Sequence, residues 1–203
     1  MKHILVAPGL YDPMSYEHLR MFHIAKQLPN VVGCVASITE KNLKYDNEKL
    51  AKDATKDLNW IEVFSWQTKL NYKQTTEDIL TYYEQMFNTM SYRPSLEGRF
   101  YFNCDDLTNV SVKLLCGSDY FQYIIESEGR HEVKRLLKRG VAIMSKFGID
   151  IESIIRDLYL DKYLDNVIIL KDPVFEYIGQ DFVRNEEKNM YLLPYLPKHY
   201  NYK

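Results

Sequence analysis

The sequence predicts a single α/β domain built on a doubly wound parallel sheet. Apolar, β-branched runs alternate along the chain with helical patterns. The runs are apolar on both faces, as in strands of a parallel sheet that helices cover on each side. A length of 203 residues, with 46% hydrophobic and 27% charged residues, fits one globular domain with a substantial core. We therefore expect residues 1–203 to form one domain.

Six apolar runs are predicted as strands. They begin with HILVA at the start of the chain and continue through VVGCVASI, WIEVFSW, VKLLCG, GVAIMS and NVIIL. Each is short and rich in valine, isoleucine or leucine, as buried strands are. The predicted strands are residues 3–7, 31–38, 60–66, 112–117, 140–145 and 166–170.

Segments with helical periodicity separate these runs. The predicted helices are residues 15–28, 47–57, 73–90, 119–138 with a break near Gly129, 150–163 and 185–198. The part of the chain from about residue 171 onward is expected to be a helical subregion of the same domain. Residues 91–111 show no period and carry proline, glycine and paired aspartates, so they are predicted to be a long connection, mobile or functional.

The expected topology places two glycine-bearing segments together. If the strand order is the common 3-2-1-4-5-6, the first and fourth strands are neighbours and a crevice lies at their carboxyl ends. Residues 9–18 follow the first strand, and residues 117–119 follow the fourth. Both segments are therefore expected at one site.

The segment after the first strand, GLYDPMSYEH, reads as G-x-x-x-P-x-S-x-x-H. Such strand-to-helix junctions bind phosphates, because unpaired amides and the positive end of the helix dipole face outward there. Gly9 allows close approach of the backbone and Pro13 stiffens the loop. Ser15 is placed as an N-cap, and His18 follows one turn into the helix. The pattern predicts a nucleotide site.

Charge and composition argue against several other classes. A formal net charge of -2 disfavours a protein whose main partner is a nucleic acid. The basic cluster KRLLKRG near residue 134 is expected to be the solvated face of a helix. No apolar run approaches the roughly 20 residues of a membrane span, and the chain opens on a strand rather than a leader. We therefore expect no membrane association and a cytoplasmic or nuclear location.

The cysteines and histidines do not suggest a metal or disulfide framework. Cys34, Cys104 and Cys116 form no C-x-x-C pair, and two of them lie in apolar runs typical of a core. His131 and His199 have no spaced partner, so no protein metal site is predicted.

Three motifs carry a resemblance to a known family. The element Ser15-Tyr16-Glu17-His18, followed by LRMF, resembles the (T/H)-x-x-H signature of the nucleotidyltransferase superfamily. The phrase VKLLCGSD at 112–119 and the segment ATKDLNWIEVFSW at 54–66 resemble the fourth-strand and third-strand regions of its nicotinamide mononucleotide (NMN) adenylyltransferases, particularly the eukaryotic type. The similarity covers most of residues 1–126. It implies a Rossmann-like nucleotidyltransferase fold.

The resemblance implies transfer of AMP from ATP to the 5′-phosphate of NMN, giving NAD and pyrophosphate; nicotinate mononucleotide remains open as an acceptor. It assigns His18 as a donor to the α-phosphate and Ser15 to the triphosphate or the NMN phosphate. Gly9 and Leu10 belong to the ATP and NAD site, where Leu10 replaces a small or hydroxyl residue, so its contact would be through the backbone. Mg²⁺ would accompany ATP through phosphate oxygens and waters.

Other positions follow from the same resemblance. Asp119 is expected to accept a hydrogen bond from a ribose hydroxyl or an amide of the nucleotide, with Gly117 allowing close approach; the alternative is that this segment only caps a helix. The segment IGQDFVR at 178–184 matches a phosphate-binding element whose hydroxyls it lacks. Its Arg184 is the candidate for the β- and γ-phosphates, with a surface arginine as the alternative.

The acceptor pocket is less well defined. The family's W-x-x-T element corresponds either to Tyr72 with Thr75 or to Lys73 with Thr76, and Tyr72 is the plausible stacking residue. At the second stacking position, Arg130 could stack by its flat face, or an aromatic residue could come from elsewhere. Lys41 and Lys44 cannot be assigned.

Two further interpretations stay open. One is a related nucleotidyltransferase with another phosphate acceptor, and the other is a non-catalytic protein that binds NAD or ATP. The expected partners are ATP, NMN or nicotinate mononucleotide, and NAD. A homo-oligomer is a further possibility, although no heptad or exposed apolar strand edge indicates an interface.

Overall fold

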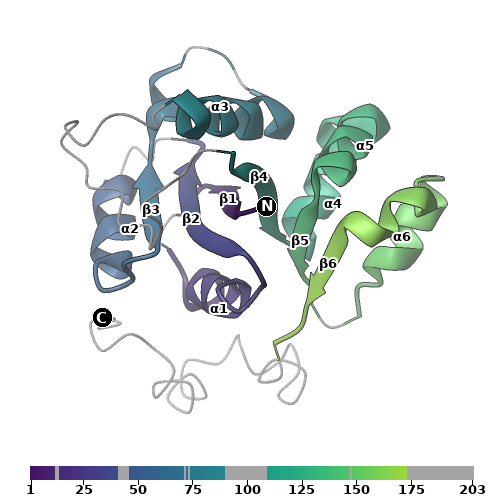
Figure 1. Ribbon diagram of the computed structural model, residues 1–203, viewed down its shortest axis with the longest axis horizontal. Coiled ribbons are helices and arrows are strands. Elements are labelled where there is room, and N and C mark those ends of the chain that lie inside the picture. The colour runs from purple at the N-terminus through teal and green to yellow at the C-terminus, as the bar shows by residue number, and fades with distance from the viewer. Residues whose placement is uncertain are drawn as a thin grey trace.

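A computed structural model describes residues 1–11, 14–40, 46–70, 72, 74–89, 109–146 and 148–172. Its centre is a six-stranded sheet in the order β3-β2-β1-β4-β5-β6, in which every neighbouring pair is parallel (Figure 1). The strands are β1 His3–Gly9, β2 Val31–Ile38, β3 Ile61–Phe64, β4 Ser111–Gly117, β5 Val141–Met144 and β6 Val167–Leu170. The doubly wound fold and its strand order are thus confirmed, and each strand ends within two residues of its prediction.

Helices connect the strands. They are α1 Tyr16–Ala25, α2 Asn47–Thr55, α3 Thr76–Thr89, α4 Ser118–Ser127, α5 Gly129–Arg139 and α6 Ile151–Asp157, with 3₁₀ turns η1 Trp66–Lys69 and η2 Asp161–Asn166. The expected break at Gly129 is confirmed, because this residue takes a positive φ of 80° and separates α4 from α5. The helix expected at 185–198, and the helical subregion from about residue 171, lie outside the described residues.

The predicted helix over 150–163 is too long. Helix α6 ends at Asp157, and Tyr159 then adopts a left-handed conformation with φ of 57°. The N–H of Tyr159 donates to the carbonyl of Arg156 at 2.8 Å, and the N–H of Leu160 donates to that of Ile155 at 3.1 Å. This is a Schellman ending formed without glycine, so the usual sequence signal for it is missing.

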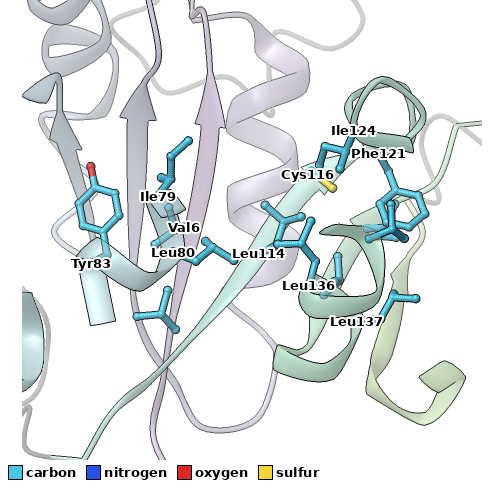
Figure 2. Close-up of a cluster of buried hydrophobic side chains, with 14 of the residues drawn as sticks. Val6, Ile79, Leu80, Tyr83, Leu114, Cys116, Phe121, Ile124, Leu136 and Leu137 are labelled. Carbon is cyan, nitrogen blue, oxygen red and sulfur yellow. The ribbon is translucent and has the colours of Figure 1, made fainter. Parts of the chain in front are cut away.

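Alternation along β1 divides the core between the two faces of the sheet. Ile4 and Val6 pack with α3, α4, α5 and α6, and part of this cluster is drawn in Figure 2. Leu5 and Ala7 pack with α1 and α2 on the opposite face. Both faces are therefore covered, as apolar parallel strands require. The thiols of Cys34 and Cys116 are buried, which agrees with their prediction as core residues, while Cys104 lies outside the described residues.

Two charged clusters join distant helices and strands. On α1, the guanidinium of Arg20 donates through Nε and Nη2 to Asp172, just after β6, at 2.9 and 2.8 Å, and both side chains are almost fully buried. The expectation that KRLLKRG is only a solvated face is wrong for its last arginine. Arg139 donates at 2.6 Å to Glu77 and at 2.6 Å to Glu84, both on α3, and its side chain is 15% exposed. Helix α5 is thereby fixed to α3.

Among the helices within the described residues, none has both the length and the apolar character needed to cross a bilayer.

Candidate active site

A cavity of about 1130 Å³ opens at the carboxyl ends of the central strands. Its walls come from the loop after β1, the start of α1, the segments after β2 and β3, the β4–α4 junction and the residues after β5. Seven residues expected at the site line this cavity: Gly9, Leu10, Ser15, His18, Tyr72, Gly117 and Asp119. The crevice between neighbouring β1 and β4 is where parallel sheets of this order bind ligands.

The start of α1 makes Nδ1 of His18 a hydrogen-bond acceptor, and burial keeps the ring neutral. Ser15 is the N-cap residue, and its backbone N–H donates to Nδ1 of His18 at 3.0 Å, with the Ser15 hydroxyl oxygen 2.8 Å from the same atom. Burial lowers the pKa of His18 to about 4; the carboxylate of Asp119 partly opposes this effect, and the ammonium of Lys146 adds to it. Because Nδ1 accepts, the neutral ring carries its proton on Nε2 and offers that N–H as a donor.

The ring of Tyr11 packs against the ring of His18. Its ring meets that of His18 edge to face, with centroids 4.9 Å apart, and its hydroxyl donates to the carbonyl of Ala7 at 2.6 Å. A Cβ at Gly9 would lie 3.2 Å from the Tyr11 ring, and Tyr11 itself has a φ of 46°. Gly9 therefore leaves room for this packing. The intervening Pro13 lies outside the described residues.

The exposed loop beside Tyr11 is tied to its neighbour by one amide. Leu10 is 54% exposed, and its carbonyl accepts from the side-chain Nδ2 of Asn47, at the start of α2, at 2.9 Å. The same Nδ2 donates to the carbonyl of Glu40 at 3.0 Å. Asn47 is buried, so this contact fixes the backbone of Leu10 at the cavity edge.

Asp119 lies opposite, where β4 runs into α4. Burial alone would raise the pKa of its carboxyl, but the Lys146 ammonium and the N–H groups of Tyr120 and Asp119 outweigh burial and lower it. Lys146 Nζ donates to Asp119 Oδ2 at 3.2 Å and lies 3.8 Å from Glu17 on α1. The N-cap of α4 is Gly117, which has no side chain to cap the helix, and Asp119 lies in its first turn. Asp119 thus remains an ionised acceptor at the cavity.

Comparison with known proteins relates the chain to a group of enzymes. No family model matches the chain. The chain is 21% identical to nicotinamide/nicotinic acid mononucleotide adenylyltransferase 1 of Bos taurus, over 97% of this chain and 85% of the relative. It is 24% identical to nicotinamide-nucleotide adenylyltransferase of Drosophila melanogaster, over 88% of this chain but only 53% of that relative's length. The chain is a relative of the NMN adenylyltransferases.

Solved structures agree on the fold of this adenylyltransferase relative. The nicotinic acid mononucleotide adenylyltransferase of Plasmodium falciparum, in a complex with APC, superposes with a TM-score of 0.60. The alignment covers 96% of each chain at 14% identity. The Rossmann-like nucleotidyltransferase fold expected from the motifs is therefore confirmed.

Two threonines that the family resemblance assigns to the acceptor are placed elsewhere in this adenylyltransferase relative. Thr75 and Asp78 form a reciprocal cap at the start of α3, with 3.2 Å from Thr75 N to Asp78 Oδ2 and 3.2 Å from Asp78 N to Thr75 Oγ1. Thr76 is buried, and its N–H and hydroxyl both donate to Glu128, at 3.0 and 2.8 Å. Neither threonine lines the cavity, whereas Tyr72 does and is 68% exposed.

The other expected residues lie away from the cavity or outside the described residues. Arg130 uses its guanidinium on the carbonyl oxygens of Leu158 and Tyr159, at 2.6 and 3.4 Å, and does not line the cavity. Arg184, Lys73, Lys41 and Lys44 all lie outside the described residues.

Sequence reasoning missed two site residues of this adenylyltransferase relative. Lys146 follows the predicted strand at 140–145, so its place at the carboxyl end of a parallel strand was a usable signal. Tyr11 lies within the motif between Gly9 and Ser15, but nothing in the sequence shows that its ring turns inward beneath His18.

Gly117, two residues before Asp119, is expected to be required for the site rather than for the fold. A Cβ at Gly117 would lie 2.5 Å from Asp119 Oδ1, so Gly117→Ala must displace that carboxylate from Lys146. The backbone of Gly117, with φ of -77° and ψ of 159°, suits alanine. We expect unfolding free energy to change by less than about 1 kcal/mol and ATP affinity to fall about tenfold.

Calorimetric titration with ATP and urea unfolding will measure both effects. Asp119→Ala should lower the affinity to a similar degree, and the double variant should be no weaker than either single variant. Additive losses would show that Gly117 acts independently of Asp119.

Proposed function

We propose that this protein transfers the adenylyl group of ATP to the 5′-phosphate of NMN, forming NAD and releasing pyrophosphate. The observation that carries the proposal is the neutral imidazole of His18 at the start of α1. Its Nδ1 is occupied by the Ser15 N–H, so its Nε2–H is left for a ligand in the cavity. A relative that shares this chemistry by name covers nearly the whole chain.

The reaction needs alignment and charge neutralisation more than a nucleophile from the protein. A phosphate oxygen of NMN forms a bond to the α-phosphorus of ATP, and the bond from that phosphorus to the bridging oxygen of the β-phosphate breaks. Pyrophosphate leaves with the electron pair. Because the attacking group is already an anion, no strong base is required, and placement of the two phosphates supplies much of the rate.

His18 is proposed to donate through Nε2–H to the α-phosphate, where charge increases in the transition state. A neutral donor suits this task, because it stays in the same protonation state across neutral pH. The N-terminus of α1 adds the positive end of its dipole at the same place. Ser15 is proposed to support the phosphates beside it.

Other residues are proposed to hold the rest of the nucleotide. Asp119 is proposed to accept from a ribose hydroxyl, and Gly117 leaves space for its carboxylate. When ATP binds, the ammonium of Lys146 is proposed to move from the Asp119 carboxylate toward the triphosphate and to neutralise part of its charge. Arg184 remains our candidate for the β- and γ-phosphates.

ATP is proposed to enter as its Mg²⁺ complex, with the ion as part of the substrate. In the described residues, no three His, Cys, Asp or Glu side chains are grouped as a metal site. An ion held by phosphate oxygens and waters needs few protein ligands. A cavity of about 1130 Å³ is large enough for a ligand bigger than a typical small molecule.

The test is an assay of purified protein with ATP, Mg²⁺ and NMN, in which NAD and pyrophosphate are both quantified. We expect the two products in equal amounts and no pyrophosphate without NMN. CTP in place of ATP, and phosphopantetheine in place of NMN, serve as comparison substrates. Turnover only with one of these would replace the proposal with another nucleotidyltransferase. Binding of ATP or NAD without any turnover would indicate a non-catalytic protein.

A further inference from the structure

One residue that lines the cavity carries a buried oxygen with no donor. Gln74, just before α3, lines the cavity, and its side-chain Oε1 is buried without a hydrogen-bond partner within the described part of the chain. Buried carbonyl oxygens are almost always hydrogen-bonded, because leaving one unsatisfied is costly. The atom therefore indicates a donor that arrives with the ligand.

The surroundings of Gln74 are aromatic and acidic. Tyr120 and Tyr123 on α4 line the same cavity, with ring centroids 5.9 Å apart and an angle of 39° between the rings. Glu128 also lines the cavity. Both oxygens of the Glu128 carboxylate accept hydrogen bonds from Thr76, two residues after Gln74. This part of the cavity presents ring faces, a neutral acceptor and a negative charge.

These features distinguish between two acceptors that differ in one group. The pyridinium ring of either mononucleotide is cationic, and tyrosine faces and a nearby carboxylate both favour a cation. An amide substituent adds N–H donors that can satisfy Gln74 Oε1. A carboxylate substituent adds no donor and would face the lone pairs of Gln74 and the charge of Glu128.

We infer that Gln74 and Glu128 select the amide, so that the acceptor is NMN rather than nicotinate mononucleotide. Gln74 accepts a hydrogen bond from the carboxamide, and Glu128 excludes the carboxylate. The inference rests on the proposed function, because it assumes that the cavity holds the acceptor of adenylyl transfer. It assigns to these two residues the choice between NMN and nicotinate mononucleotide, which the sequence motifs leave open.

The test compares kcat/KM for NMN and for nicotinate mononucleotide in the same assay of NAD or its nicotinate counterpart. We expect the wild type to favour NMN by at least about tenfold, the order expected from the net contribution of one hydrogen bond. Gln74→Leu should lower kcat/KM for NMN about tenfold and leave the value for the nicotinate acceptor nearly unchanged. Glu128→Gln should raise the nicotinate value several-fold, because the negative charge is removed.

Gln85→Leu is the matched control, since Gln85 is exposed on α3 and does not line the cavity. It should leave both values unchanged. Calorimetric titration with each mononucleotide separates binding from turnover and should show the same loss of preference in Kd. Equal use of the two acceptors, or an unchanged ratio in Gln74→Leu while NAD is still formed, would overturn the inference alone. Absence of product from both acceptors would overturn the proposed function.

Discussion

Replacement of His18 with alanine is expected to lower kcat for NAD formation about 10²- to 10³-fold, the usual loss when one transition-state donor is removed. The KM values for ATP and NMN should change much less, because the contact strengthens as charge gathers on the α-phosphate. Steady-state kinetics with saturating MgATP will measure this. His18→Gln should recover part of the rate only if its amide reaches the same oxygen.

The control is His23→Ala, which changes the same residue type on an exposed position of α1. It should retain full activity. Circular dichroism of both variants shows whether the fold is intact. An active His18→Ala enzyme, with kcat within about threefold of the wild type, would contradict the role of this residue in transition-state stabilisation.

The same histidine fixes the expected pH dependence. Burial lowers its folded-state pKa from 6.5 to about 4, so the neutral donor persists well below neutral pH and His18 contributes no loss of rate near pH 6.5. Unfolding free energy should fall as the pH is lowered, because His18 binds a proton more tightly in the unfolded chain than in the folded one. The contribution is complete above pH 6.5 and is lost as pH falls through about 4. Urea unfolding between pH 7 and 4 should show a steeper loss for the wild type than for His18→Gln.

The sheet could be predicted because its information is local. Short β-branched runs identify the strands, and the right-handed crossover rule together with the common strand order arranges them. The first loop and the segment at 117–119 then meet without knowledge of any side-chain contact. This is why the sequence predicts Gly9, Ser15, His18 and Asp119 at one place, and all four line the same cavity.

The contact between Lys146 and Asp119 depends on strand register, which the sequence does not reveal. Gly117 pairs with Met144 across β4 and β5, so the residues that follow both strands emerge side by side. The backbone N–H of Lys146 then donates to Ser118 at 3.2 Å, and its ammonium reaches Asp119. A lysine after a strand is common, and only this pairing gives it a partner.

Thr75 and Thr76 show the opposite case. The family resemblance assigns them to the acceptor pocket, but their local sequence also fits a helix cap. The sequence Thr75-Thr76-Glu77-Asp78 is also an N-terminal capping pattern. In the structure, Thr75 and Asp78 satisfy each other, and Thr76 satisfies Glu128. Their polar groups are already used within the protein, while Oε1 of the neighbouring Gln74 has no hydrogen-bond partner among the described residues.

Replacement of Asp172 with alanine is expected to cost about 3–5 kcal/mol of unfolding free energy. The change leaves the guanidinium of Arg20 buried without the carboxylate that accepts its Nε and Nη2 bonds. Arg20 lies on the same helix as His18, so the pair also fixes α1 against the residue that follows β6. Urea denaturation monitored by circular dichroism will give the value.

The double variant Arg20→Met with Asp172→Leu separates the loss of the ion pair from the cost of leaving one charge buried without its partner. Removal of both charges avoids a buried guanidinium that has lost this carboxylate, and apolar side chains of similar volume often restore or exceed the original stability. The double variant should therefore be more stable than Asp172→Ala. Glu152→Ala, which breaks an exposed pair with Arg156 on α6, should change stability by about 0.5 kcal/mol or less. A loss of the same small size for Asp172→Ala would mean that water reaches Arg20, and that the ion pair contributes little to the attachment of α1.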